Sequence, residues 1–131
     1  MKALLISANP RLREEMAVAV RSVGRRAGEP VEAFLEAADG VRGIALARRH
    51  QPDLVIADEI TSRAGAFAVA QDLKGGEPPF RGIVVILLDR PQDEWLAGWS
   101  GADAWFVKPV DPFALADTVA GFLTEANKEA V

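Results

Sequence analysis

Cysteine is absent from the 131-residue sequence, which excludes disulfide bonds and thiolate metal sites. No apolar run is long enough to cross a bilayer, and GIVVILL falls far short of that length. The first residues also lack the basic, apolar and small-residue regions of a signal peptide. These absences predict a soluble, cytoplasmic protein without membrane contact.

Phosphate-binding signatures are also missing. Neither the dinucleotide pattern GxGxxG nor the P-loop pattern GxxxxGK[ST] occurs, and no hydroxyl- and glycine-rich loop follows the first apolar segment. The net charge of −4 and the lack of a nucleic-acid-binding signature argue against direct contact with nucleic acid. A small α/β enzyme or nucleotide binder has only fold-level analogy in its favour, so we expect no enzymatic activity.

Five apolar segments alternate with helical patterns along the chain. The segments are ALLI (3–6), VEAFL (31–35), LVIA (54–57), GIVVILL (82–88) and AWFV (104–107). Four of them are nearly continuous apolar runs, which are typical of strands covered on both faces of a parallel sheet. VEAFL alternates instead, which favours a place nearer the sheet edge.

Helices are expected after each of these segments. An apolar stripe predicts the first helix: Leu12, Met16, Val20, Val23 and Ala27. Asn9-Pro10 and Asp111-Pro112 are typical starts of the first and last helices. Weaker patterns cover 40–50, 64–74 and 93–100, and 75–82 is a loop. We therefore predict one α/β domain over residues 1–131, a doubly wound five-stranded parallel sheet of (βα)5 order.

Ligands of such a sheet bind beyond the carboxyl ends of its strands. Asp58 and Lys108 each follow an apolar strand there, and they allow two interpretations. They could be a nucleophilic carboxylate and a cation that steadies a transferred group. They could equally be a structural ion pair, because a partly buried lysine needs a partner.

Two motifs identify a resemblance. PDLVIAD (52–58) and GADAWFVKP (101–109), together with KALLISANP and AADG, resemble the receiver domain of response regulators over nearly the whole chain. The resemblance implies the flavodoxin-like receiver architecture. It makes Asp58 the equivalent of the phosphoacceptor and Lys108-Pro109 the near-invariant Lys-Pro pair, whose peptide bond is usually cis.

The chain departs from this family where the metal ligands belong. Receivers typically read V-D-D-x-P after the first strand, whereas this chain reads Ile6-Ser7-Ala8-Asn9-Pro10. Mg²⁺ requires several hard oxygen ligands, and Asp58 with one backbone carbonyl near Ile60 is a poor site. Asn9 or Asp89 could each add one oxygen, but neither restores the acid pair. We therefore expect no bound metal and no cofactor, with Mg²⁺ only if the chain is phosphorylated.

The switch positions differ too. Receivers carry Ser or Thr at the end of the fourth strand, where this chain has Leu88, which has no donor. The coupled aromatic is usually Tyr or Phe, and here it is Trp105. Loss of the acid pair, the hydroxyl and the usual aromatic together resembles a degenerate receiver, or pseudo-receiver.

Three tryptophans lie close together. Trp95 and Trp99 share a face of the predicted fourth helix, and Trp105 lies on the fifth strand. They could form an interaction surface, because tryptophan is enriched at binding hot spots, or they could fill the core. The family resemblance implies a partner that is a signalling protein or output domain, and it leaves open a homodimer through the fourth helix, fifth strand and fifth helix.

The leading hypothesis is a phosphorylation-independent protein-interaction module. The alternative is a phosphoacceptor of a two-component phosphorelay, phosphorylated at Asp58. The sequence names neither the partner nor the signal, and it does not decide whether an output domain follows residue 131.

Overall fold

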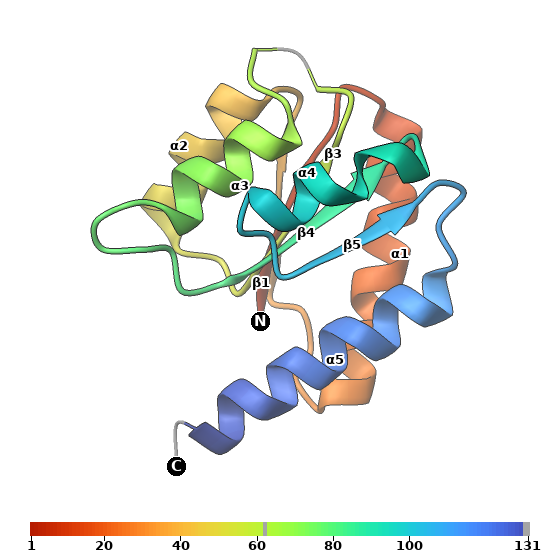
Figure 1. The fold of residues 1–131 in the computed structure, drawn as a ribbon. Coiled ribbons are helices and arrows are strands. Elements are labelled where there is room, and N and C mark those ends of the chain that lie inside the picture. The colour runs from red at the N-terminus through yellow and green to blue at the C-terminus, as the bar shows by residue number, and fades with distance from the viewer. Residues whose placement is uncertain (62, 130–131) are drawn as a thin grey trace.

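Five parallel strands form the centre of the molecule, with helices on both faces of the sheet (Figure 1). The computed structural model describes residues 1–61 and 63–129, with side chains up to residue 125. The expected boundary at residue 131 lies outside the described residues. The strand order is β2-β1-β3-β4-β5, and the bounds are β1 (Lys2–Ile6), β2 (Ala33–Ala37), β3 (Leu54–Asp58), β4 (Ile83–Leu88) and β5 (Ala104–Val107). This is the predicted doubly wound α/β fold.

The helices divide between the two faces of the sheet. α1 (Pro10–Ala27) and α5 (Pro112–Glu129) cover one face. The other face is covered by α2 (Gly40–His50), α3 (Ala66–Lys74) and the short α4 (Glu94–Trp99), which follows a 3₁₀ turn at Pro91–Asp93. Within the described part of the chain, no helix is both long and apolar enough to span a membrane.

Local sequence explains where the first and last helices begin. The Asn9 side chain accepts hydrogen bonds from the backbone N–H groups of Arg11 and Leu12, and Pro10 is the first helical residue. The Asp111 side chain accepts a hydrogen bond from the Phe113 backbone N–H at 2.9 Å. The predicted Asn-Pro and Asp-Pro starts are confirmed.

The second strand lies at the sheet edge, as its alternating pattern predicts, but its predicted bounds are wrong. The prediction was 31–35, whereas β2 covers Ala33–Ala37. The register with β1 sets these bounds, since Lys2 lies opposite Ala33 and Ile6 lies opposite Ala37. The apolar alternation begins at Val31, before the strand, so the pattern could not reveal this pairing.

Strand β4 links the two halves of the core. All six of its residues are buried, and neighbouring side chains point to opposite faces. Leu87 packs in the cluster under α1 and α5, whereas Leu88 packs in the cluster under α2, α3 and α4. Because the strands are parallel, the loops after β1, β3, β4 and β5 meet at one edge of the sheet.

Candidate functional site

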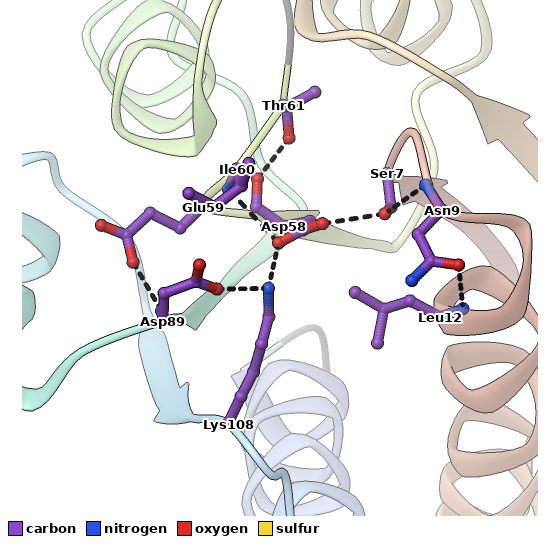
Figure 2. Close-up of polar contacts among 9 residues, drawn as sticks. All are labelled: Ser7, Asn9, Leu12, Asp58, Glu59, Ile60, Thr61, Asp89 and Lys108. Atoms are coloured by element: carbon purple, nitrogen blue, oxygen red, sulfur yellow. Dashed lines mark hydrogen bonds and ion pairs between the residues drawn. The ribbon is translucent and has the colours of Figure 1, made fainter.

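Asp58 is the last residue of β3 and lies at the centre of this edge (Figure 2). It is only 4% exposed, and both of its carboxylate oxygens are engaged. Oδ2 accepts a hydrogen bond from the Ser7 hydroxyl at 2.8 Å. Oδ1 accepts one from the Lys108 ammonium and a longer one, 3.3 Å, from the Ile60 backbone N–H. The carboxylate is therefore held from three sides by groups of the protein itself.

Ser7 connects Asp58 to the start of α1. The side chain is fully buried, and its Oγ also accepts a hydrogen bond from the Asn9 backbone N–H at 3.0 Å. The Ser7 carbonyl accepts a hydrogen bond from the Arg13 guanidinium, which reaches back from the first turns of α1. Ala8 is exposed and provides no polar side chain. Ser7 thus offers Asp58 a neutral hydroxyl donor.

Lys108 follows β5 and lies between two carboxylates. Its ammonium contacts Asp58 and donates to Asp89 Oδ1 at 2.6 Å, and we call these three residues the ion triad. Burial would lower the pKa of Lys108, but the hydrogen bonds and charges of Asp58 and Asp89 outweigh burial and raise it. With one positive and two negative groups, the triad has a net charge of about −1. The Lys108–Pro109 peptide bond is cis, as the family resemblance predicts.

A chain of polar contacts extends from the ion triad to α4. The Asp89 backbone N–H donates to Glu59 Oε2 at 2.6 Å, and Glu59 shares a hydrogen bond with Asp93, next to the start of α4. Burial and this hydrogen bond raise the pKa of Glu59. Asp93 also accepts from Arg90 at 3.0 Å, and the Arg90 and Glu59 hydrogen bonds lower the pKa of Asp93.

Sequence reasoning missed part of this arrangement. It considered Asp89 only as a displaced metal ligand, and it gave no role to Glu59, Thr61 or Asp93. The Thr61 hydroxyl donates to the Asp58 carbonyl and fixes the loop after β3. The signal was available for Glu59 and Asp89, because they follow the neighbouring strands β3 and β4 and must meet at the same edge.

The residues around Asp58 do not fit Mg²⁺. The ion prefers octahedral coordination by oxygen atoms and is usually held by carboxylates with water. Both Asp58 oxygens already accept hydrogen bonds, Ser7 is a neutral hydroxyl, and the Asp89 carboxylate is bound to Lys108. Among the described side chains, which are those of residues 1–61 and 63–125, no group of three or more acidic, histidine or cysteine residues is arranged to hold a metal ion.

Leu88 and Trp105, which the family resemblance places at the switch positions, are both packed side chains. Leu88 is fully buried in the core beneath α3 and α4, so this position contributes apolar packing. Trp105 is half-buried against the same core cluster, and its Nε1 donates to Glu94 Oε2 at 3.2 Å. The ring lies close to Gly98, where an added Cβ would be 3.5 Å from the ring edge. Trp105 therefore links β5 to α4 through a hydrogen bond to Glu94 and a ring contact at Gly98.

Trp95 and Trp99 do not fill the core. Their exposed fractions are 69% and 63%, whereas Ala97 between them is fully buried. We call these two side chains the tryptophan face. Exposure of two indoles on one six-residue helix is unusual for a purely structural role, since tryptophan is highly buried on average.

A parallel (βα)5 sheet with an acid at the end of β3 and a lysine directly after β5, both at one edge, is the architecture of a receiver domain. No family model matches the chain. The sequence is 34% identical over 128 residues to an uncharacterized response regulatory protein of Mycobacterium tuberculosis, found in strains CDC 1551 and H37Rv, and the match covers 94% of this chain and 91% of the relative. The chain belongs to the response-regulator family, whose receiver domains are signalling modules.

Solved structures show the same fold. The receiver domain of AraT, a response regulator from Geobacillus stearothermophilus, is similar with a TM-score of 0.75 and 23% identity over 99% of this chain and 98% of that one. The receiver domain of a sensor histidine kinase from Pseudomonas aeruginosa PAO1 gives a TM-score of 0.76 and 18% identity, covering 93% and 96% of the two chains. That structure has a magnesium ion coordinated in its active site cleft.

Proposed function

We propose that this receiver acts mainly as a phosphorylation-independent protein-interaction module, which binds another signalling protein or an output domain through the tryptophan face. The proposal includes no catalytic turnover. One observation carries it: the Asp58 carboxylate is bound on one oxygen by Ser7 and on the other by Lys108. Ser7, directly after β1, supplies a hydroxyl where a metal-binding acid would be needed.

Electrostatics supports this proposal. Phosphoryl transfer depends on positioning and on positive charge that offsets the charge developing on the phosphoryl group. Lys108 is the cation in contact with Asp58, and its charge is shared with Asp89. The ion triad therefore repels an incoming phosphate, because its net charge remains negative.

Preorganisation supports the choice of surface. The tryptophan face lies on a helix that is fastened by the Trp105–Glu94 hydrogen bond and by the contacts from Asp89 through Glu59 to Asp93. A surface already held in one conformation loses less entropy when a partner binds. Exposed indoles offer large apolar area for a partner to cover.

The site is tested by tryptophan fluorescence during titration with Mg²⁺ and then with Mg²⁺ plus beryllofluoride, an aspartyl-phosphate mimic. We expect no saturable change, because Asp58 lacks the acid pair that would complete a metal site. The Asp58→Ala variant is the control and should give the same flat trace. A saturable signal in the wild type that disappears in Asp58→Ala would overturn the proposal.

The tryptophan face is tested by replacing Trp95 and Trp99 with alanine. We expect capture of the binding partner from cells to fall by about 30-fold or more, as for loss of a binding hot spot. Because both side chains are exposed, the free energy of unfolding should change by only about 0.5 kcal/mol. Phe113→Ala, at an exposed aromatic on α5, is the matched control. Equal capture by the wild type and the double variant would contradict the assignment.

A phosphoacceptor role for Asp58 is the second candidate. The contact between Asp58 and Lys108 favours it, because this is the pair that a phosphotransfer site would use. Incubation with acetyl phosphate and Mg²⁺, followed by intact-mass spectrometry, separates the two candidates. An added phosphoryl group that is absent from Asp58→Asn would support this second role.

A further inference from the structure

An apolar groove lies between α1 and α5, on the opposite face of the sheet from the tryptophan face. Its volume is about 470 Å³, within the range of small-molecule sites. Its apolar lining includes Met16 and Ala19 of α1, Leu87 of β4, Leu115 of α5, and Pro109 in the loop before α5. We call it the α1–α5 groove.

Two charged residues line this groove, and they differ in how they are neutralised. The Lys108 ammonium is bound by Asp58 and Asp89, so its charge is already compensated. Glu15 is exposed on α1, and its carboxylate forms no ion pair within the part of the chain that the structure describes. The charge available to a ligand is therefore that of Glu15.

We infer that the α1–α5 groove binds a small amphipathic amine, with its apolar body between α1 and α5 and its ammonium group on the Glu15 carboxylate. Charge complementarity selects this class of ligand. The Lys108 charge is compensated by Asp58 and Asp89, so Glu15 is the lining residue whose charge is left to pair with an ammonium. A neutral molecule of the same shape gains the apolar contacts alone.

Such a ligand would reach the candidate site directly. Lys108 lines both the groove and the ion triad, and Leu87 is the β4 residue opposite Asp58 in the sheet register. A molecule in the groove therefore contacts residues that adjoin Asp58 without needing a phosphoryl group. This inference does not depend on the tryptophan face, which belongs to another surface of the molecule.

Tryptamine and tryptophol form a matched pair of probes, because they share an indole body and differ in an amine or a hydroxyl. Titrations followed by backbone amide chemical shifts should show saturable changes at Ala19, Leu87 and Val110 with tryptamine and weaker binding of tryptophol. Glu15→Gln should weaken tryptamine binding by about fivefold, the scale of a partly exposed charge pair. The neighbouring Glu14→Gln, which makes the same charge change outside the groove, should leave it unchanged.

The contact between the apolar body of the ligand and the α1–α5 groove is tested by a substitution that fills the groove. Ala19→Leu should reduce the affinity for both probes, provided that its amide spectrum shows a folded domain. Glu15→Gln alters only an exposed side chain and keeps the test decisive if Ala19→Leu does not fold. The inference is overturned if tryptamine gives no saturable shifts in the groove, if it binds no better than tryptophol, or if Glu15→Gln and Glu14→Gln behave alike.

Discussion

Replacing Ser7 and Ala8 together by aspartate is expected to create saturable Mg²⁺ binding and to make the stability of the domain depend on the metal. The new carboxylates would follow β1 beside Asp58, whose Oδ2 is 2.8 Å from the present Ser7 hydroxyl. Without metal, a carboxylate at fully buried position 7 would lie against Asp58 and lower the free energy of unfolding by about 3 kcal/mol. Mg²⁺ at 100 times its dissociation constant should restore about 2.7 kcal/mol.

Urea unfolding with and without Mg²⁺ measures both effects. The Ser7→Asn, Ala8→Asn variant is the matched control, because it adds similar bulk without charge and should show no response to Mg²⁺. A double-aspartate variant as indifferent to Mg²⁺ as the wild type would mean that the acid pair is not the missing part of the site. The proposed reason for phosphorylation independence would then be wrong.

Replacing Lys108 by methionine should destabilise the protein strongly, because it leaves two carboxylates without their shared cation. Breaking a fully buried pair costs about 3–5 kcal/mol. The Lys108 side chain is 26% exposed, so solvent screening reduces the expected loss to about 2 kcal/mol. Urea unfolding at neutral pH measures it, with Lys2→Met at an exposed position as the control.

A second substitution separates charge from packing. Asp58→Asn in the Lys108→Met background removes one unpaired charge. The double variant should therefore lose less free energy of unfolding than the sum of the losses in Asp58→Asn and Lys108→Met. Strict additivity would show that the loss comes from packing of the lysine stem rather than from the ion triad.

The pH dependence of the Lys108 contribution follows from its raised pKa. The ordinary pKa is 10.5, and the hydrogen bonds to Asp58 and Asp89 raise it in the folded protein despite burial. The stabilisation is therefore fully present below pH 10.5 and is lost as pH rises through the higher folded-state pKa. The wild type and Lys108→Met should differ by a constant free energy near neutral pH and converge only above pH 10.5.

Much of the fold could be predicted because its signals are local. Continuous apolar runs located β1, β3, β4 and β5, and the Asn9-Pro10 start of α1 is a capping pattern within three residues. The bounds of β2 could not be predicted this way, because they depend on which β1 residue lies opposite each of its residues. Register is a property of two segments that are distant in the sequence.

The candidate site likewise has features that local sequence predicts and features that depend on contacts between distant segments. Asp58 and Lys108 could be found from strand ends, and their contact is as expected for either interpretation. The position of Ser7 indicated only a lost acid, whereas its hydroxyl is a donor to Asp58. That role depends on a side-chain distance across the sheet. The same applies to Asp89, whose partner could have been a metal, solvent or Lys108.

The complete burial of β4 has a consequence for motion. Its backbone is paired with β3 on one side and β5 on the other, so its amide hydrogens can exchange with solvent only when the whole sheet opens. By contrast, α4 is a six-residue helix at the surface, a type of element that opens locally at a much lower free energy. Hydrogen exchange should therefore be fast around Trp95 and slow at Leu87 and Leu88. Local opening of α4 would thus expose its own backbone amides while the strand beneath it stays paired.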